Sequence, residues 1–221
     1  MWLFFEVYRD CESGSHNNDV ILQMNYLAHA FLSFDNADIL TGNMISDFVK
    51  GKKKLAYPLP IQKGIHLHRL IDNFTDFHPV TARAKEFFRP QYRLYSGAFM
   101  DIVYDHFLAL DQPQFEKYGG LEKFTHQAYH LLDTEISYFP PPFDKMFPYM
   151  KMQDWLYNYR LRDGIKSGFG GLVRRAAYLD ESDIAFKIFN ERYSELGSCY
   201  ADFFPELKAY TFERLSHLLA E

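Results

Sequence analysis

The fold is decided most clearly between residues 64 and 76, which read Gly-Ile-His-Leu-His-Arg-Leu-Ile-Asp-Asn-Phe-Thr-Asp. On a helix, which turns by about 100° per residue, the apolar side chains of this segment share one arc that a core can cover. They are Leu67, Leu70, Ile71 and Phe74. His68, Asp72 and Asp76 follow one another at intervals of four residues and form a stripe beside that arc. The stripe predicts either two ligands for one cation, an imidazole and a carboxylate, or an ordinary polar flank with capping and ion-pair contacts.

The rest of the chain continues the helical pattern. Helices are expected near residues 25–34, 38–49, 58–77, 80–88, 96–110, 121–138 and from 182 onward past 205, with shorter helices up to 177. Glycine and proline separate them, and no convincing alternation typical of a β-strand is present. We therefore expect an all-α, single-domain helical bundle over residues 24–221. Residues 1–23 are turn-rich and carry no pattern, so we interpret them as an N-terminal appendage, with Met24 as the candidate natural start.

Composition narrows the class of protein. The 221 residues are enough for one sizeable core, and a net charge of −5 argues against a general nucleic-acid binder. Two cysteines provide no disulfide framework, which favours a reducing compartment. No apolar run approaches the roughly 20 residues of a membrane span, and the first residues lack the features of a secretory signal. We expect a cytoplasmic protein without a membrane partner.

Ionisable residues occur where apolar ones are expected. His29 and Asp47 interrupt two apolar helices, and Asp101, Asp105 and His106 lie in the most hydrophobic one, which has no lysine or arginine between residues 96 and 110. A carboxylate buried without a partner costs several kcal/mol. Compensation by basic residues from elsewhere, by shared protons or by a metal ion is therefore required. As a set, these residues favour a divalent metal site; alone, His29 is typical of a hydrogen-bonded core histidine and Asp47 of a helix-end acid.

A basic run follows Asp47 within one turn and consists of Lys50, Lys52, Lys53 and Lys54. Such a run is usually only a solvated loop. Here it lies beside a candidate active-site acid in an acidic protein, so we interpret it as a surface that steers an anionic partner. The chain contains no Gly-rich phosphate loop, no Gly-x-Ser-x-Gly elbow, no Cys-x-x-Cys pair and no Glu-x-x-His motif.

Five motifs, taken together and in order, resemble the bacterial acyl carrier protein phosphodiesterases. They are Met24-Asn-Tyr-Leu-Ala-His29, Gly42-Asn-Met-Ile-Ser-Asp-Phe-Val-Lys-Gly51, the segment 64–76, Asp101 with Asp105-His-Phe-Leu108, and Trp155-Leu156 with Tyr159-Arg160. The resemblance begins at Met24 and leaves residues 1–23 uncovered. That family is itself similar to a divergent branch of the HD metal-dependent phosphohydrolases, which are all-helical.

The resemblance implies hydrolysis of the phosphodiester that joins 4′-phosphopantetheine to a serine of holo acyl carrier protein, with Mn²⁺ or else Mg²⁺ as cofactor. It implies a carrier protein as partner, met by the lysines at 50–54, and no nucleic acid. By position it implies metal ligands at His29, Asp47, His68, Asp72 and Asp105. The chain departs from the HD pattern because it has no adjacent His-Asp dipeptide, so Asp76 or His66 is an alternative ligand.

The catalytic candidates are Asp47, Arg69, Asp101 and His106. Arg69 would offset charge on the phosphoryl oxygens, and His106, or else His66, would act as general acid for the leaving serine oxygen. Two other classes of protein stay open. One is a phosphohydrolase of the same architecture acting on a nucleotide or another small phosphoester. The other is a non-catalytic helical binding module whose acids share protons or form ion pairs.

Overall fold

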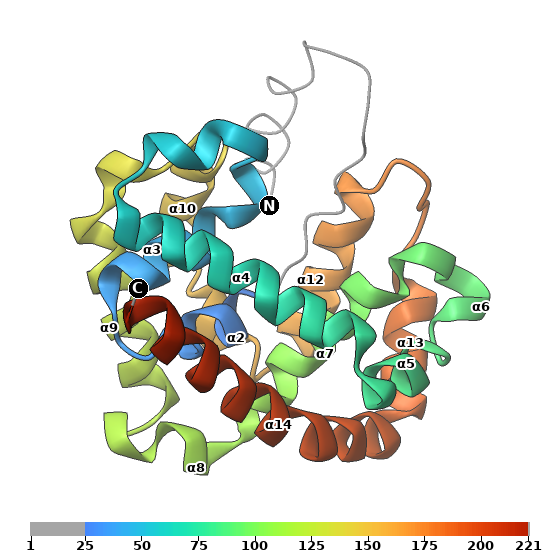
Figure 1. Ribbon diagram of the computed structural model, residues 1–221. Helices are drawn as coiled ribbons and strands as arrows, with labels where there is room; N and C mark the ends of the chain where they lie inside the picture. The colour runs from blue at the N-terminus through green and yellow to red at the C-terminus, as the bar shows by residue number, and fades with distance from the viewer. Residues whose placement is uncertain (1–24, 221) are drawn as a thin grey trace.

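The computed structural model describes residues 25–220, and all its regular elements are helices (Figure 1). This confirms the expected all-α fold. The interpretation of residues 1–23 as an appendage lies outside the described residues. None of the described helices combines the length and the hydropathy needed to cross a membrane.

The helices agree with the predicted ranges in most places. The α-helices are α2 (Tyr26–Phe31), α3 (Ala37–Ile45), α4 (Leu59–Phe77), α5 (Pro79–Lys85), α6 (Arg89–Tyr92), α7 (Ser96–Leu110), α8 (Gln112–Phe115), α9 (Leu121–Thr134), α10 (Phe143–Met152), α11 (Trp155–Asn158), α12 (Arg162–Arg175), α13 (Asp183–Glu191) and α14 (Tyr193–Ala220). The 3-10 turns are η1 (Ser46–Phe48), η2 (Gly51–Ala56), η3 (Arg93–Tyr95), η4 (Glu116–Tyr118) and η5 (Ile136–Tyr138).

Several predicted helices end earlier in the structure; the one expected over 121–138, for example, ends at Thr134 and is followed by η5. The helix expected over 38–49 ends at Ile45, and η1 and η2 follow it, so Asp47 and the lysine run lie on 3-10 turns. The long final helix expected from residue 182 divides at Arg192 into α13 and α14, and α14 then continues through the exposed Pro205. Apolar spacing cannot distinguish a continuous helix from two helices joined by one residue, because the pattern continues across the junction.

Helices α3 and α4 pack against each other at backbone distance. A Cβ atom on Gly42 would lie 2.2 Å from the carbonyl oxygen of Ile61, and one on Gly64 would lie 2.5 Å from that of Ile39. No side chain fits at either position, so glycine is required at the crossing. The close approach brings the end of α3 beside the middle of α4, where His68 lies.

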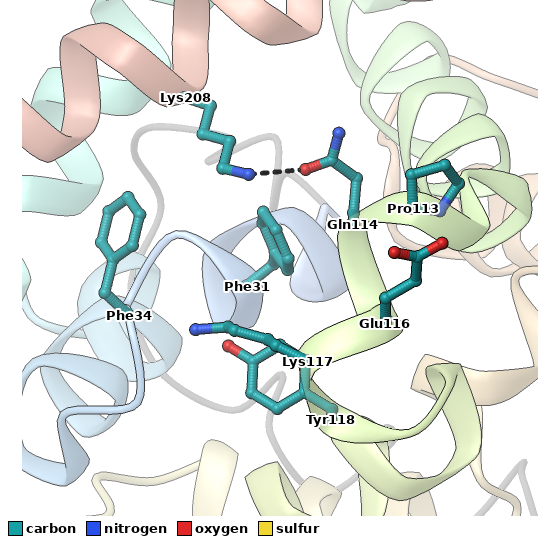
Figure 2. Close-up of a pocket in the computed structure, with 8 residues that line it drawn as sticks. All are labelled: Phe31, Phe34, Pro113, Gln114, Glu116, Lys117, Tyr118 and Lys208. Carbon is teal, nitrogen blue, oxygen red and sulfur yellow. Dashed lines mark hydrogen bonds between the residues drawn. The ribbon is translucent and has the colours of Figure 1, made fainter.

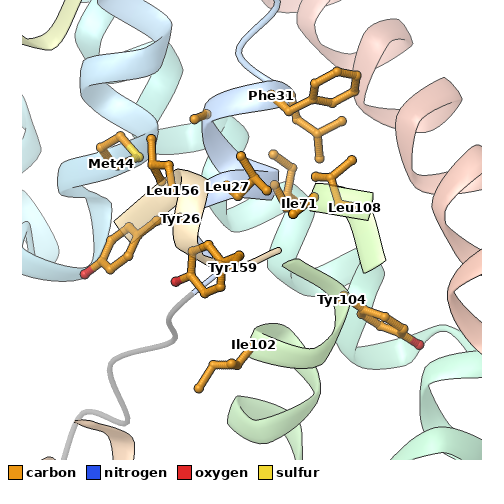
Figure 3. Packing of buried hydrophobic residues seen from close by; sticks show 14 of the residues in the cluster. Tyr26, Leu27, Phe31, Met44, Ile71, Ile102, Tyr104, Leu108, Leu156 and Tyr159 are labelled. Atoms are coloured by element: carbon orange, nitrogen blue, oxygen red, sulfur yellow. The ribbon is translucent and has the colours of Figure 1, made fainter. Parts of the chain in front are cut away.

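Helix α7 forms the centre of the core. Ile102, Val103 and Leu108 are buried on it, and Leu27 of α2 and Ile71 of α4 lie nearby (Figure 3). Helices α4 and α14 cross in front of α7 in the view of Figure 1. The core thus fixes α2, α4 and α7 relative to one another, and these are the helices that carry most of the candidate residues.

Candidate metal centre

His29, His68 and Asp72 converge at one point of the structure. Nε2 of His29 lies 3.2 Å from Oδ1 of Asp72, and Nε2 of His68 lies 3.0 Å from Oδ2 of the same carboxylate. One ligand atom from each residue lies within 4.8 Å of the others, and no other described residues form such a group of His, Cys, Asp and Glu. The two helices that supply them, α2 and α4, are separated by 27 residues of sequence between Phe31 and Leu59. Tertiary packing therefore assembles three of the five predicted ligands.

Asp47 lies against this group from η1. Its Oδ1 is 3.2 Å from Nε2 of His68, and its side chain retains 16% of its exposure. We call His29, Asp47, His68 and Asp72 the metal-centre cluster. His68 is the shared member, because its Nε2 faces the carboxylates of both Asp47 and Asp72.

Asn43 fixes the orientation of both imidazoles. Nδ1 of His68 donates to the backbone oxygen of Asn43 at 2.8 Å, and Nδ1 of His29 donates to its side-chain Oδ1, also at 2.8 Å. The amide nitrogen of Asn43 donates in turn to the backbone oxygen of His29 and to Oγ of Ser33, both at 3.1 Å. With the protons held on Nδ1, both Nε2 atoms are directed into the cluster.

Asn43 was not among the site residues predicted from the sequence. The available signal was an amide four residues before Asp47, directly before the apolar pair Met44 and Ile45. In the structure this amide is fully buried. An amide in such a place must find partners for several donors and acceptors. A neutral side chain nevertheless carries no charge signal, so a search for metal ligands passes over it.

Burial and charge act in opposite directions on the cluster. Burial alone would lower the pKa of His68, but the charges of Asp72 and Asp47 outweigh it and raise that pKa to about 10. Burial alone would raise the pKa of Asp72, but the charge of the adjacent His68 holds it below its usual range. Burial, with the charge of His68, lowers the pKa of His29. Without a metal the cluster thus holds a protonated His68, a neutral His29 and an ionised Asp72.

The residues present fit a divalent cation. Nε2 of His29 is buried and has no aligned hydrogen-bond partner among the described residues, and its ring stacks on that of His68 with 4.0 Å between centroids. Protonating both stacked imidazoles would place two positive charges in contact, which is costly. In the absence of a metal, only one of the two Nε2 atoms therefore carries a proton. A cation would satisfy both Nε2 atoms and the carboxylate of Asp72. Two imidazoles with carboxylates suit borderline divalent metals.

Asp105 has a different environment from the one predicted. Its Oδ2 accepts the backbone N–H of Leu27 at 3.0 Å, and its Oδ1 accepts that of Ala28 at 2.8 Å. Burial raises its pKa, and these two hydrogen bonds oppose the rise. Both oxygens serve the first turn of α2, and Asp105 does not join the convergent group. The geometry supports a role in holding α2, on which His29 lies, in place of the expected ligand role.

Asp101 and His106 also lie outside the cluster. Burial raises the pKa of Asp101 well above its usual range, and the charges of Asp72 and Asp76 add to the effect. A protonated carboxyl group explains how this helix holds a buried acid without a lysine or arginine of its own. His106 engages both ring nitrogens elsewhere, with the backbone oxygen of Tyr159 at 2.7 Å and the hydroxyl of Tyr193 at 2.9 Å. The general-acid hypothesis for His106 is therefore not supported.

The remaining predicted residues lie on the outer surface of α4 or on η2. Nη2 of Arg69 donates to the backbone oxygen of Val49 at 3.1 Å, at the edge of the cluster. His66 is exposed, and Asp76 pairs with Lys85 at 2.7 Å. Neither of these two alternative ligands joins the group. Lys50, Lys52, Lys53 and Lys54 flank or form η2 and have exposed or half-exposed side chains.

A separate pocket of about 360 Å³ lies between α2, α8, η4 and α14 (Figure 2). None of the candidate site residues lines it. Its two lysines are engaged: Nζ of Lys208 donates to Oε1 of Gln114 at 2.7 Å, and Lys117 pairs with Asp35 at 2.9 Å. The pocket is thus distinct from the metal-centre cluster.

Comparison with known proteins gives one consistent family. A family model described as acyl carrier protein phosphodiesterase matches residues 24–207. Relatives named acyl carrier protein phosphodiesterase include those of Shigella boydii serotype 4 (strain Sb227), 32% identical over 186 residues, and Enterobacter sp. (strain 638), 33% identical over 184 residues. The alignments cover 84% and 83% of this chain and 96% and 95% of the relatives. No solved structure matches the chain.

Proposed function

The chain belongs to the acyl carrier protein phosphodiesterase family, and from this membership we propose that it hydrolyses the phosphodiester between 4′-phosphopantetheine and a serine of holo acyl carrier protein. The products are apo acyl carrier protein and free 4′-phosphopantetheine. The observation that carries the proposal is the convergence of His29, His68 and Asp72 within the matched region. The family is one of enzymes by its description, and a buried cluster of imidazoles and carboxylates is typical of metal-assisted hydrolysis.

The cofactor in this proposal is a divalent cation, Mn²⁺ in the first place and Mg²⁺ in the second. His29, His68 and Asp72 would hold it, with Asp47 beside them. Such a cation supplies Lewis acidity, which lowers the pKa of water and offsets charge on the phosphoryl oxygens. The support lies in the donor set and in the orphaned Nε2 of His29.

The chain's own residues then have separable tasks. Asn43 keeps the protons of both histidines on Nδ1. Asp72 faces both Nε2 atoms and fixes their separation. Asp47, which contacts only His68 within the cluster, is the candidate acceptor for the proton of the attacking water. Arg69, at the edge of the cluster, keeps its candidate role beside the phosphoryl group.

The proposed location is the cytoplasm, where carrier proteins are expected to be loaded and unloaded. The support is the cysteine content, because two cysteines provide no disulfide framework and favour a reducing compartment.

Mass spectrometry of holo acyl carrier protein incubated with the purified protein and Mn²⁺ tests the function directly. We expect loss of the prosthetic group, and no loss when a chelator is present. A free phosphodiester of small size is the second substrate. Cleavage of the small diester with an intact carrier protein would replace the proposal by a phosphohydrolase of small esters. An intact carrier protein and an intact diester, at full metal occupancy, would refute both.

A further inference from the structure

A long segment beside the metal-centre cluster carries only positive charge. Residues 48–71 contain six of the chain's 24 lysines and arginines and none of its 29 aspartates and glutamates. The rest of the chain therefore carries 18 basic against 29 acidic residues. A cationic region of this size within an acidic protein produces a local field of the opposite sign to that of the remaining surface.

These cations are available to a partner. Lys50, Lys52 and Lys53 are exposed, and Lys54 and Lys63 are half-exposed. None of the five makes an ion pair with a carboxylate of the described residues, whereas Lys85, Lys117 and Lys151 each do. The segment thus keeps its charge uncompensated, although acidic residues are in excess over the molecule.

Two leucines lie exposed among the cations. Leu55, in η2, retains 63% of its exposure, and Leu59, at the start of α4, retains 61%. Leu59, Lys63 and His66 recur at the spacing of one helix face, which is the outer face of α4. Aliphatic side chains surrounded by like charges are typical of a protein-binding surface in which the apolar centre supplies affinity and the charges supply orientation.

This surface borders the cluster. Asp47 precedes Lys50 by three residues, and the hydrogen bond from Arg69 to Val49 holds the start of the segment against α4. In Figure 1 the first part of the segment forms the turns that lead into the N-terminal end of α4, and the rest belongs to α4 itself. A partner seated here would have its reactive group next to His68 and Asp47.

We propose that the surface formed by Lys50, Lys52, Lys53, Lys54, Leu55, Leu59 and Lys63 is the docking site for an acidic protein. This proposal rests on the proposed function, under which the acidic protein is the carrier protein itself. Its carboxylates would contact the lysines, and one of its apolar side chains would contact the two leucines. The residues of this surface are lysines and leucines, which favours a protein partner over nucleic acid. Nucleic acids are more often bound through arginine and stacked aromatic side chains. Two separated leucines also offer too little apolar area to anchor a membrane.

The test combines a charge reversal and an apolar deletion with matched controls. Lys52→Glu/Lys53→Glu and Leu55→Ser alter the docking surface. Lys123→Glu/Lys145→Glu and Leu94→Ser make the same changes at exposed positions elsewhere, where Leu94 retains 88% of its exposure. The readouts are the affinity for apo carrier protein, which cannot be cleaved, the KM for holo carrier protein at low and high salt, and the number of Mn²⁺ ions bound.

We expect the charge reversal to weaken the affinity for apo carrier protein and raise the KM for the holo form by about 10-fold or more at low salt, with a smaller salt dependence. Leu55→Ser should weaken binding by about 3- to 10-fold at every salt concentration, since it removes apolar contact. Both controls should stay within about twofold of wild type. Bound Mn²⁺ should be unchanged in all four variants.

Equal effects of surface and control variants would overturn the docking site while leaving the hydrolysis intact. Failure of the wild-type protein to cleave holo carrier protein, with apo carrier protein still bound through Lys52, Lys53 and Leu55, would overturn the proposed function and support the surface. Binding of single-stranded DNA or of anionic vesicles in place of the carrier protein, lost in the same variants, would assign the surface to another class of partner and contradict the proposal.

Discussion

Two groups of buried ionisable side chains occupy neighbouring parts of the core, and they are compensated in different ways. The metal-centre cluster brings the side-chain atoms of His29, His68 and Asp72 to one point, with Asp47 against His68. The α7 group, Asp101, Asp105 and His106, distributes its polar atoms to separate partners. Both groups satisfy the same physical requirement, which is that a buried polar group must be paired or neutralised. Only convergence creates a place for a cation.

The α7 group still contributes to the site. Asp105 accepts two backbone N–H groups at the start of α2, one turn or less before His29. The first N–H groups of a helix have no partner within the helix, so a carboxylate from a neighbouring helix satisfies them as a capping residue would. His106 connects α7 to Tyr159 and to Tyr193 of α14. The α7 group therefore holds the helices of the scaffold in place, whereas the metal-centre cluster is the proposed place of the chemistry.

Asp72→Ala should produce the largest effect. The variant removes the carboxylate that faces both Nε2 atoms, so we expect loss of bound Mn²⁺ and a fall in carrier-protein hydrolysis of about 10³-fold or more. Mass spectrometry of the carrier protein and circular dichroism measure activity and fold. Substantial activity in a helical, well-folded variant would remove Asp72 from the centre.

Asn43→Ala should weaken metal binding without removing it. The ligands remain, and the backbone oxygen that accepts from His68 is kept, but His29 loses the side-chain acceptor of its Nδ1 proton. Such outer partners are typically worth about 10- to 100-fold in metal affinity. Calorimetric titration with Mn²⁺ measures the metal affinity. The nitrogen NMR shifts of His29, compared before and after the substitution, report whether its proton leaves Nδ1. An unchanged affinity together with unchanged shifts would show that Asn43 has no positioning role.

Acidification should release the metal. In the metal-free cluster His68 holds a proton on Nε2, because its pKa is raised to about 10, and this proton must leave before Nε2 can bind a cation. Mn²⁺ binding near neutral pH should therefore release about one proton, and the affinity should fall about tenfold for each unit of decreasing pH. Calorimetry in two buffers of different ionisation enthalpy counts the protons. Binding without proton release would contradict a ligand role for His68.

Asp105→Asn should have the smallest effect on the metal. The amide keeps one acceptor for the N–H groups of Leu27 and Ala28 but turns an NH₂ toward the other, so we expect the free energy of unfolding to fall by about 1–3 kcal/mol. Mn²⁺ affinity should stay within about threefold of wild type. Chemical denaturation and titration measure the two quantities. A loss of bound Mn²⁺ with an unchanged free energy of unfolding would identify Asp105 as a metal ligand. The metal-centre cluster and the α7 group would then no longer differ in role.

The sequence predicted those parts of the site that depend on local spacing or on a conflict with the apolar pattern. The interval of four residues placed His68 and Asp72 on one face of α4, and an imidazole inside an apolar helix singled out His29. The all-α fold followed from the same periodicity. Asp47 was also selected, although its helix ends earlier than expected.

What the sequence could not predict depends on tertiary contacts. A buried acid looks the same whether it meets a cation, a proton or two backbone N–H groups, so Asp105 could not be distinguished from Asp72. The role of Asn43 depends on the crossing of α3 and α4 at Gly42 and Gly64, which spacing along one chain segment does not reveal. His106 was selected by its neighbours in sequence, whereas its partners come from residues 53 and 87 positions away.

The central claim is that His29, His68 and Asp72 bind one divalent cation. A crystal structure of the protein with Mn²⁺, with anomalous diffraction recorded at the manganese edge, tests it most directly. The account predicts one strong anomalous peak within coordination distance of Nε2 of His29, Nε2 of His68 and a carboxylate oxygen of Asp72. A peak beside Asp105 and His106, or no peak in this cluster at saturating Mn²⁺, would contradict it.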